Sequence, residues 1–198
     1  MTYLATSLKL AKFSGTERTA GLGRGLPDPC MQFAKVCLFA DDAKLYKHVT
    51  SRKDHQSFQN GSNTLQEWSN RWLLKLNISK CKTVFYGRNI NYEYNYYLSS
   101  TELERVDVMK DLGVVFDSEL SFVSHCREKI NRAYSMLGLV KRNFIHLTED
   151  AFVALCKSLV RCHLECANSV WNPYRQGLIM DLEKVQMRAT KLVITYNC

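Results

Sequence analysis

Two adjacent carboxylates, Asp41 and Asp42, stand between two short apolar runs, at residues 36–40 and 43–49. This pattern predicts two strands joined by a tight acidic turn. Paired acids at the tip of an apolar hairpin are costly unless water or a cation neutralises them. Mg²⁺ prefers such oxygen ligands, and a two-metal site uses them in phosphoryl transfer. Taken alone, the pair is better explained as a solvated turn, because Asp is a common turn residue.

A helix is expected directly after this hairpin. Ser51 followed by Asp54 is a typical helix start, and we place the helix at about 54–75. Gly61 weakens its middle and could split it. Apolar residues recur on one face of this segment, namely Leu65, Trp68, Trp72, Leu73 and Leu76.

Further along, strands are expected at residues 82–87 and 112–116, and helices after residue 120. Thr148 is a candidate helix cap, followed by the cleanest amphipathic pattern of the chain up to Leu164. A last helix is expected at 178–193. The sequence therefore predicts an α+β fold with a mixed front half and a helical back half. Residues 1–25 are small, polar and Gly-rich, and we interpret them as a flexible lead-in.

Bulk composition limits the partners and the compartment. The net charge of +8 favours polyanionic partners such as nucleic acid, although many soluble proteins are equally basic. No apolar stretch is long enough to cross a bilayer and no secretory signal is visible, so we expect an intracellular protein, cytoplasmic or nuclear, without a membrane partner. The eight cysteines are then expected to be reduced and buried. Cys162 and Cys166 share a helix face, but no second pair at zinc spacing follows.

The stretch Phe39-Ala-Asp-Asp-Ala-Lys-Leu-Tyr46 resembles the third acidic motif of reverse transcriptases, in the form found in LINE-type (jockey-like, non-LTR) retrotransposons. Further segments resemble later motifs of the same family in the same order. They are residues 65–72, 76–83, 110–117, 155–161, 171–173 and 182–191. The resemblance covers about residues 26–198. It implies a partial polymerase palm at 26–118 followed by a helical thumb at 119–198.

The resemblance also implies roles for individual residues. Asp41 matches the catalytic aspartate that binds the metal ions, and Asp42 matches its less direct partner. Lys80 and Lys82 match basic positions near the incoming nucleotide or its phosphates, although solvated lysines beside a strand explain them equally well. The implied cofactor is Mg²⁺, and the implied partners are an RNA template and the RNA–DNA hybrid.

Aromatic residues allow two interpretations. Trp68 and Trp72 could stack on bases, but their helical spacing favours packing in the core. The group Tyr92, Tyr94, Tyr96 and Tyr97 could touch nucleic acid, and alternation in a half-buried hairpin explains it as well.

The chain also departs from the family pattern. Family polymerases carry a further metal-binding aspartate on an earlier palm strand, and a Gln-Gly loop that shapes the nucleotide pocket. Residues 1–25 contain no aspartate, and Asp28 lies in a Pro-Asp-Pro turn. We therefore expect a fragment without fingers, inactive alone, whose hairpin exposes an unpaired edge. Whether it is an enzyme stays open. The alternatives are a non-catalytic nucleic-acid-binding remnant and a decayed transposon copy without a selected role.

Overall fold

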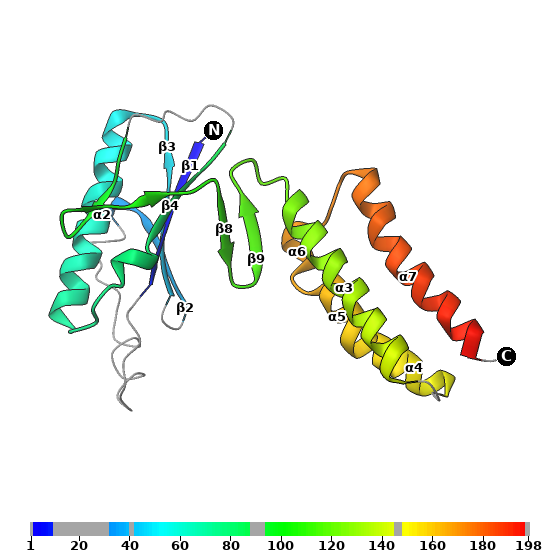
Figure 1. Ribbon diagram of the computed structural model, residues 1–198. Helices are drawn as coiled ribbons and strands as arrows, with labels where there is room; N and C mark the ends of the chain where they lie inside the picture. The colour runs from blue at the N-terminus through cyan, green and yellow to red at the C-terminus, as the bar shows by residue number, and fades with distance from the viewer. Residues whose placement is uncertain (1, 10–31, 40–41, 88–93, 145–147, 197–198) are drawn as a thin grey trace. The chain divides into compact units, whose positions relative to one another are not determined.

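The computed structural model describes residues 2–9, 32–39, 42–87, 94–144 and 148–196. The chain forms two compact units. Unit 1 comprises Met1–Met109 and Asp117–Leu120, and unit 2 comprises Lys110–Phe116 and Ser121–Cys198. Unit 1 is a sheet with a helix on one face, and unit 2 is mainly helical (Figure 1). The expected α+β class is confirmed.

The described part of unit 1 is built on a five-stranded sheet with the order β2-β3-β1-β4-β7. Neighbouring strands are antiparallel except β4 and β7, which run parallel. The strands of this sheet are β1 (Thr2–Lys9), β2 (Lys35–Phe39), β3 (Asp42–Val49), β4 (Lys82–Tyr86) and β7 (Glu104–Arg105). The predicted hairpin and the strand after residue 82 are thus confirmed.

Strand β1 corrects the interpretation of the N-terminal segment. The sequence predicts a flexible lead-in at residues 1–25, yet Thr2–Lys9 pair with β3 over their whole length and with β4 over most of it. Residues 10–25 lie outside the described residues. Leu4 and Thr6 are fully buried on the same side of this strand. Because the buried Thr6 is polar, the sequence shows no alternation of apolar and polar residues here. The hydroxyl of Thr6 lies 3.4 Å from that of Thr83. The expected open edge of β3 is therefore covered by β1, and β2 lies at the edge of the sheet instead.

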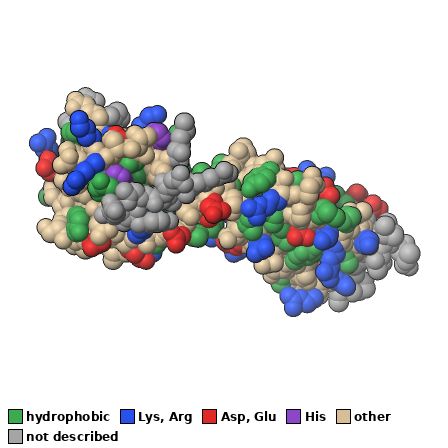
Figure 2. All heavy atoms as spheres, turned by 90° about the horizontal axis from the view of Figure 1, so that it is seen from above, with side chains coloured by type: hydrophobic (Ala, Val, Ile, Leu, Met, Phe, Trp, Pro, Cys, Tyr) green, Lys and Arg blue, Asp and Glu red, His purple; other side chains and the backbone are tan. Residues whose placement is uncertain are grey.

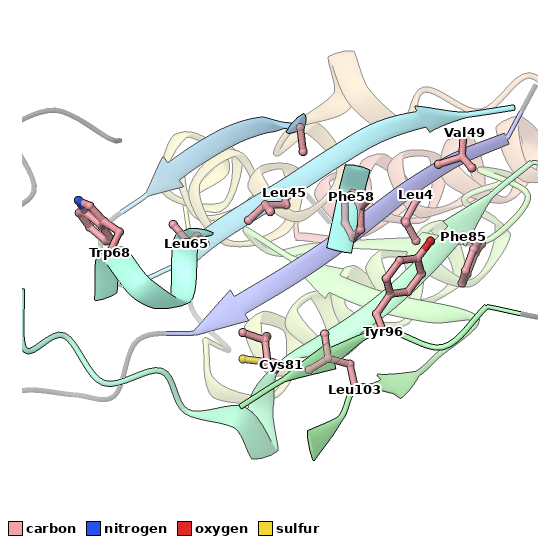
Figure 3. Close-up of a cluster of buried hydrophobic side chains, with 13 residues drawn as sticks. Leu4, Leu45, Val49, Phe58, Leu65, Trp68, Cys81, Phe85, Tyr96 and Leu103 are labelled. Atoms are coloured by element: carbon pink, nitrogen blue, oxygen red, sulfur yellow. The ribbon is translucent and has the colours of Figure 1, made fainter. Parts of the chain in front are cut away.

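One helix, α2 (Arg52–Arg71), covers a single face of this sheet (Figure 1). Phe58 on α2 lies against Leu4 and the ring of Tyr96 in the core of unit 1 (Figure 3). Helix α2 continues through Gly61 without a break. The missing side chain lets the helix approach Phe33 closely, since a Cβ at Gly61 would lie 3.3 Å from the Cβ of Phe33.

The two tryptophans of this region behave differently. Trp68 is 8% exposed and belongs to the core, as expected. Trp72 is 43% exposed, so the prediction of core packing is wrong for this residue. Trp72 is the C-cap of α2, so the helix ends there. The helical spacing that predicted a buried face therefore does not continue to this residue.

Short hairpins complete the β structure. The strand expected at 112–116 is instead the second half of a hairpin that turns at Leu112 and Gly113, both with positive φ. Its strands are β8 (Val108–Asp111) and β9 (Val114–Asp117), and a smaller pair is formed by β5 (Tyr97–Leu98) and β6 (Thr101–Glu102).

Unit 2 follows the expected helical pattern. Its helices are α3 (Val123–Asn143), α4 (Glu149–Leu155), a π-helical segment η2 (Cys156–Arg161), α5 (Cys162–Glu165), α6 (Asn168–Trp171) and α7 (Gln176–Tyr196). Thr148 caps α4 by accepting from the Ala151 N–H at 3.4 Å, as predicted. Helix α3 packs on both α5 and α7 around a core that includes Leu137, Phe152 and Val185.

The described cysteines are free thiols, as expected, but not all are buried. Cys81 and Cys126 lie in the interior. Cys37, Cys162 and Cys166 are exposed, so the prediction of buried thiols is wrong for these three.

The start of α2 offers a test of local stability. The Asp54 carboxylate accepts hydrogen bonds from the backbone N–H groups of Thr50 and Ser51, at 3.0 and 2.9 Å. Together with the Ser51 hydroxyl, these groups hold the pKa of Asp54 well below its usual range. We predict that Asp54→Ala lowers the free energy of unfolding by about 1 kcal/mol at pH 7 in urea denaturation.

The pH dependence of this effect has a defined sign. A lowered pKa in the folded state gives stability that is complete above the ordinary carboxyl pKa and is lost as the pH falls from there through the lowered pKa of the folded state. The difference between wild type and Asp54→Ala should therefore shrink on acidification. Glu67→Ala, on the exposed face of the same helix, is the control and should have a much smaller effect. Equal losses in the two variants would contradict the capping role.

Candidate functional site

The β2–β3 hairpin carries the predicted acidic turn. Phe39 and Asp42 are opposite each other in the antiparallel register, and Ala40 and Asp41 connect them. Asp42 is half-buried at the first position of β3. Asp41 lies outside the described residues, so its predicted catalytic and metal-binding role stays a prediction. The two strands that the sequence predicted on either side of the acids are confirmed, and the residues that join them lie outside the described part of the chain.

The strand beside this hairpin brings no further acid to it. Lys9 on β1 is in register with Asp42, and Leu8 is in register with Ala43. All eight residues of β1 lack a carboxylate. Within the described residues, no group of three or more His, Cys, Asp or Glu side chains could hold a metal ion.

The two predicted lysines have different environments. Lys82, at the start of β4, forms an ion pair with Glu104 at 3.1 Å, and both side chains are well exposed. Lys80 is exposed at the end of the short 3₁₀ helix η1 (Ile78–Lys80). Strand β1 separates β4 from β3, so the backbone of Lys82 lies two strand spacings, about 10 Å, from β3. The sheet thus places Lys82 near Asp42 without direct contact, and the nucleotide-contacting role of both lysines stays a prediction.

One face of the sheet is covered by α2, and the other carries rings and charges, several of them within the Phe39–Tyr46 stretch. Lys47 points toward α2, where its Nζ donates to the Ser57 hydroxyl at 2.6 Å. Successive side chains of a strand alternate between faces, so the even-numbered residues of β3 point away from α2. We call this side the open face, and its members on β1, β2 and β3 are Tyr3, Ala5, Lys35, Cys37, Phe39, Asp42, Lys44, Tyr46 and His48.

A second missed feature is an aromatic cluster around a buried histidine. His55 on α2 stacks on Tyr94 with ring centroids 3.8 Å apart, and its Nδ1 is hydrogen-bonded to the hydroxyl of Tyr96. Burial lowers the pKa of His55 and raises that of Tyr96, so both are neutral near pH 7. Packing around His55 therefore explains Tyr94 and Tyr96, two members of the predicted tyrosine group. Tyr97 is exposed, and Tyr92 lies outside the described residues.

A pocket of about 290 Å³ adjoins this cluster. It is lined by Thr83, Phe85, Tyr94, Asn95, Tyr96, Glu102, Leu103, Glu104 and Arg105. The Arg105 guanidinium lies 4.4 Å from the centroid of the Phe85 ring. The chain's own cation therefore occupies the aromatic surface, which is the part of the pocket best suited to a ligand ring or cation.

Unit 2 carries a concentration of positive charge. Its sequence has twelve Lys and Arg against seven Asp and Glu, and blue side chains gather over its helices in Figure 2. Helix α3 packs on α5. Burial lowers the pKa of His163 on α5, and the positive charges of Arg132 and Lys129 on α3 lower it further. We call these three residues the α3 basic patch. Arg161 is already paired with Glu165, and Lys110 with Glu128.

Comparison of the chain with family models, with curated proteins and with solved structures finds no match. Within the described segments, no helix is both long and apolar enough to cross a membrane.

The buried histidine gives a test of the aromatic cluster. We predict that Tyr96→Phe destabilises unit 1 by about 1–3 kcal/mol, because His55 Nδ1 is left buried without its partner. Urea denaturation followed by circular dichroism measures the effect. The matched control is Tyr97→Phe, which removes an exposed hydroxyl one residue away and should be neutral. Equal stability of Tyr96→Phe and wild type would show that the hydroxyl does not satisfy the imidazole.

Proposed function

We propose that this chain is the palm-and-thumb part of a reverse transcriptase from a LINE-type retrotransposon, and that it binds an RNA template and the RNA–DNA hybrid. The observation that carries the proposal is the Phe39–Asp42 turn on an antiparallel hairpin, at one end of a sheet covered by α2. The helices of unit 2 come next in the chain. This order of elements agrees with the order of the motifs that the sequence resembles.

The family reaction is RNA-directed DNA synthesis, in which Mg²⁺ ions neutralise charge on the reacting phosphates. Asp41 and Asp42 are the residues that would take part in holding such ions. The neighbouring strand β1 carries no carboxylate from Thr2 to Lys9. We therefore propose that the chain alone binds nucleic acid without polymerising DNA.

A second candidate function is non-catalytic binding of nucleic acid, and the α3 basic patch favours it. Lys129 and Arg132 stand at positions i and i+3 of α3, so both lie on one side of the helix. Arg132 is exposed and Lys129 is half-buried. Two cations held at this spacing suit the phosphates of a duplex backbone, which need no sequence-specific contact.

Primer extension separates the two candidates. With an oligo(dT) primer on poly(A) and Mg²⁺, we expect the purified chain to add no nucleotides above background, because the described residues do not complete a two-metal site. Asp41→Ala should match wild type in this assay. Robust extension by wild type that is abolished in Asp41→Ala would show a complete catalytic centre and would overturn the proposed inactivity.

Salt dependence tests the contact to the duplex. We expect affinity for an RNA–DNA hybrid to fall steeply with salt, and the double variant Lys129→Ala/Arg132→Ala to reduce the slope of log K against log[salt] by about 2, at ~0.9 per phosphate. Arg52→Ala/Lys53→Ala, at the start of α2, removes the same charge and is the control. An unchanged slope in the α3 variant, or an equal change in both, would remove the basic patch from the binding surface.

A further inference from the structure

Strand β2 ends the sheet of unit 1 on one side, because it pairs with β3 and with no other described strand. Among the described residues, no further backbone hydrogen bond involves β2, so the N–H and C=O groups along its outer side are unpaired. An edge strand of this kind is a template for pairing with another chain. We propose that β2 pairs antiparallel with the β2 strand of a second copy of this chain, about a two-fold axis. Such a dimer does not depend on nucleic acid, so it goes beyond the proposed function and stands apart from it.

The residues of β2 do little to prevent this pairing. Proteins block exposed edges with proline, with bulges or with charged side chains, especially lysine. Strand β2 contains no proline, pairs regularly with β3 over its five residues, and carries its single charge at the first position, Lys35. The other four residues are Val36, Cys37, Leu38 and Phe39, and Phe39 is 60% exposed. The edge therefore presents a regular strand that is apolar over most of its length.

A two-fold axis through Cys37 gives the antiparallel register in which all residues of both strands are paired. Cys37 then lies opposite Cys37 of the second copy, and Val36 lies opposite Leu38. Lys35 lies opposite Phe39, a favourable cross-strand pair because the face of an aromatic ring attracts a cation. The Lys35 side chains of the two copies are about 14 Å apart along the strands in this register. The register therefore places no like charges opposite each other.

The two faces of β2 also match across this pair. Side chains alternate along a strand, so Lys35, Cys37 and Phe39 point to the open face, and Val36 and Leu38 point to the α2 side. A two-fold axis perpendicular to the sheet keeps the open faces of both copies on the same side. Val36 and Leu38 are only partly buried against the core of unit 1. Pairing brings these two residues of one copy against the same two of the other, which buries apolar surface that a single chain exposes.

This self-complementarity favours a second copy over an unrelated extended peptide. The cation, the ring and the aliphatic side chains that β2 needs opposite it are all present in β2 itself. The opposite edge of the described sheet is β7, which has only two residues, Glu104 and Arg105, and offers a much shorter template. Pairing of β2 with β2 occupies the longer edge in both copies at once. An isologous contact of this kind closes, so assembly is expected to stop at the dimer.

Disulfide trapping of the wild-type chain tests the register. Facing residues of an antiparallel pair have Cα atoms about 4.5–5.5 Å apart, within the range that a disulfide spans. Cys37 is exposed, so added diamide should join the two Cys37 thiols and take up their two protons and two electrons. Peptide mass spectrometry should find the tryptic peptide of residues 36–44 linked to itself, a product that requires two chains. Links between chains through the exposed Cys162 or Cys166, without the Cys37 product, would overturn the assignment.

Analytical ultracentrifugation of the reduced chain measures association without cysteine chemistry. We expect a monomer–dimer equilibrium across the micromolar range. Phe39→Lys places lysines opposite each other in both symmetry-related pairs and should weaken dimerisation roughly 2- to 30-fold. Lys35→Glu/Phe39→Lys replaces these with two Glu–Lys pairs and should restore dimerisation to within about threefold of wild type. Tyr97→Lys is the matched control, because it adds the same charge at an exposed ring on β5, outside this sheet, and should dimerise like wild type.

The outcomes separate a β2 dimer from other contacts and from the proposed function. Far-UV circular dichroism checks that each variant is folded, which is expected because both substituted side chains of β2 are exposed. A chain that stays monomeric across this range, or a double variant that dimerises no better than Phe39→Lys, would contradict the proposal. Equal weakening in Phe39→Lys and Tyr97→Lys would place the contact elsewhere, and growth beyond the dimer would indicate a contact that does not close. Each of these failures leaves hybrid binding by the wild-type chain, and so the proposed function, unaffected.

Discussion

The alternation of side chains along β3 is the constraint on which unit 1 depends. β3 pairs with β2 on one edge and β1 on the other, and α2 buries Ala43 and Leu45 on one face. A slip of one residue would turn these two outward and bring Lys44 and Tyr46 into the core, so the register is strongly specified. The same register sets Asp42 at the turn and the rings on the open face. The chemistry of the surface therefore follows from the packing beneath it.

Local signals in the sequence were sufficient for several elements. The two strands around the acidic pair, the Ser51–Asp54 helix start and the Thr148 cap all involve residues within a few positions of each other, and the structure confirms them. Features that depend on distant pairing were missed. Strand β1 is recognisable only beside β3 and β4, because the polar Thr6 is buried through a contact 77 residues away. The open face could not be identified before that strand order was known.

The ion pair between Lys82 and Glu104 illustrates a limit of motif-based roles. The sequence indicated a phosphate contact, and the structure shows a carboxylate partner at 3.1 Å. Both side chains are more than a third exposed, and exposed ion pairs contribute only about 0–1 kcal/mol to stability. Such a pair opens at little cost when a phosphate competes for the lysine. The glutamate partner and the role that the resemblance implies for Lys82 are therefore compatible.

Binding and catalysis place different demands on this scaffold. A surface that attracts phosphates tolerates small displacements, since its cations act separately and long side chains adjust. Phosphoryl transfer instead needs carboxylates that hold two metal ions about 3.5–4 Å apart in line with the reacting oxygens. Strand β1, which pairs with β3, carries no carboxylate from Thr2 to Lys9. The same strand that completes the sheet, and so presents the open face, thus supplies no acidic partner for the turn. Within the described residues, the strand that pairs with β3 therefore adds no carboxylate beside Asp42.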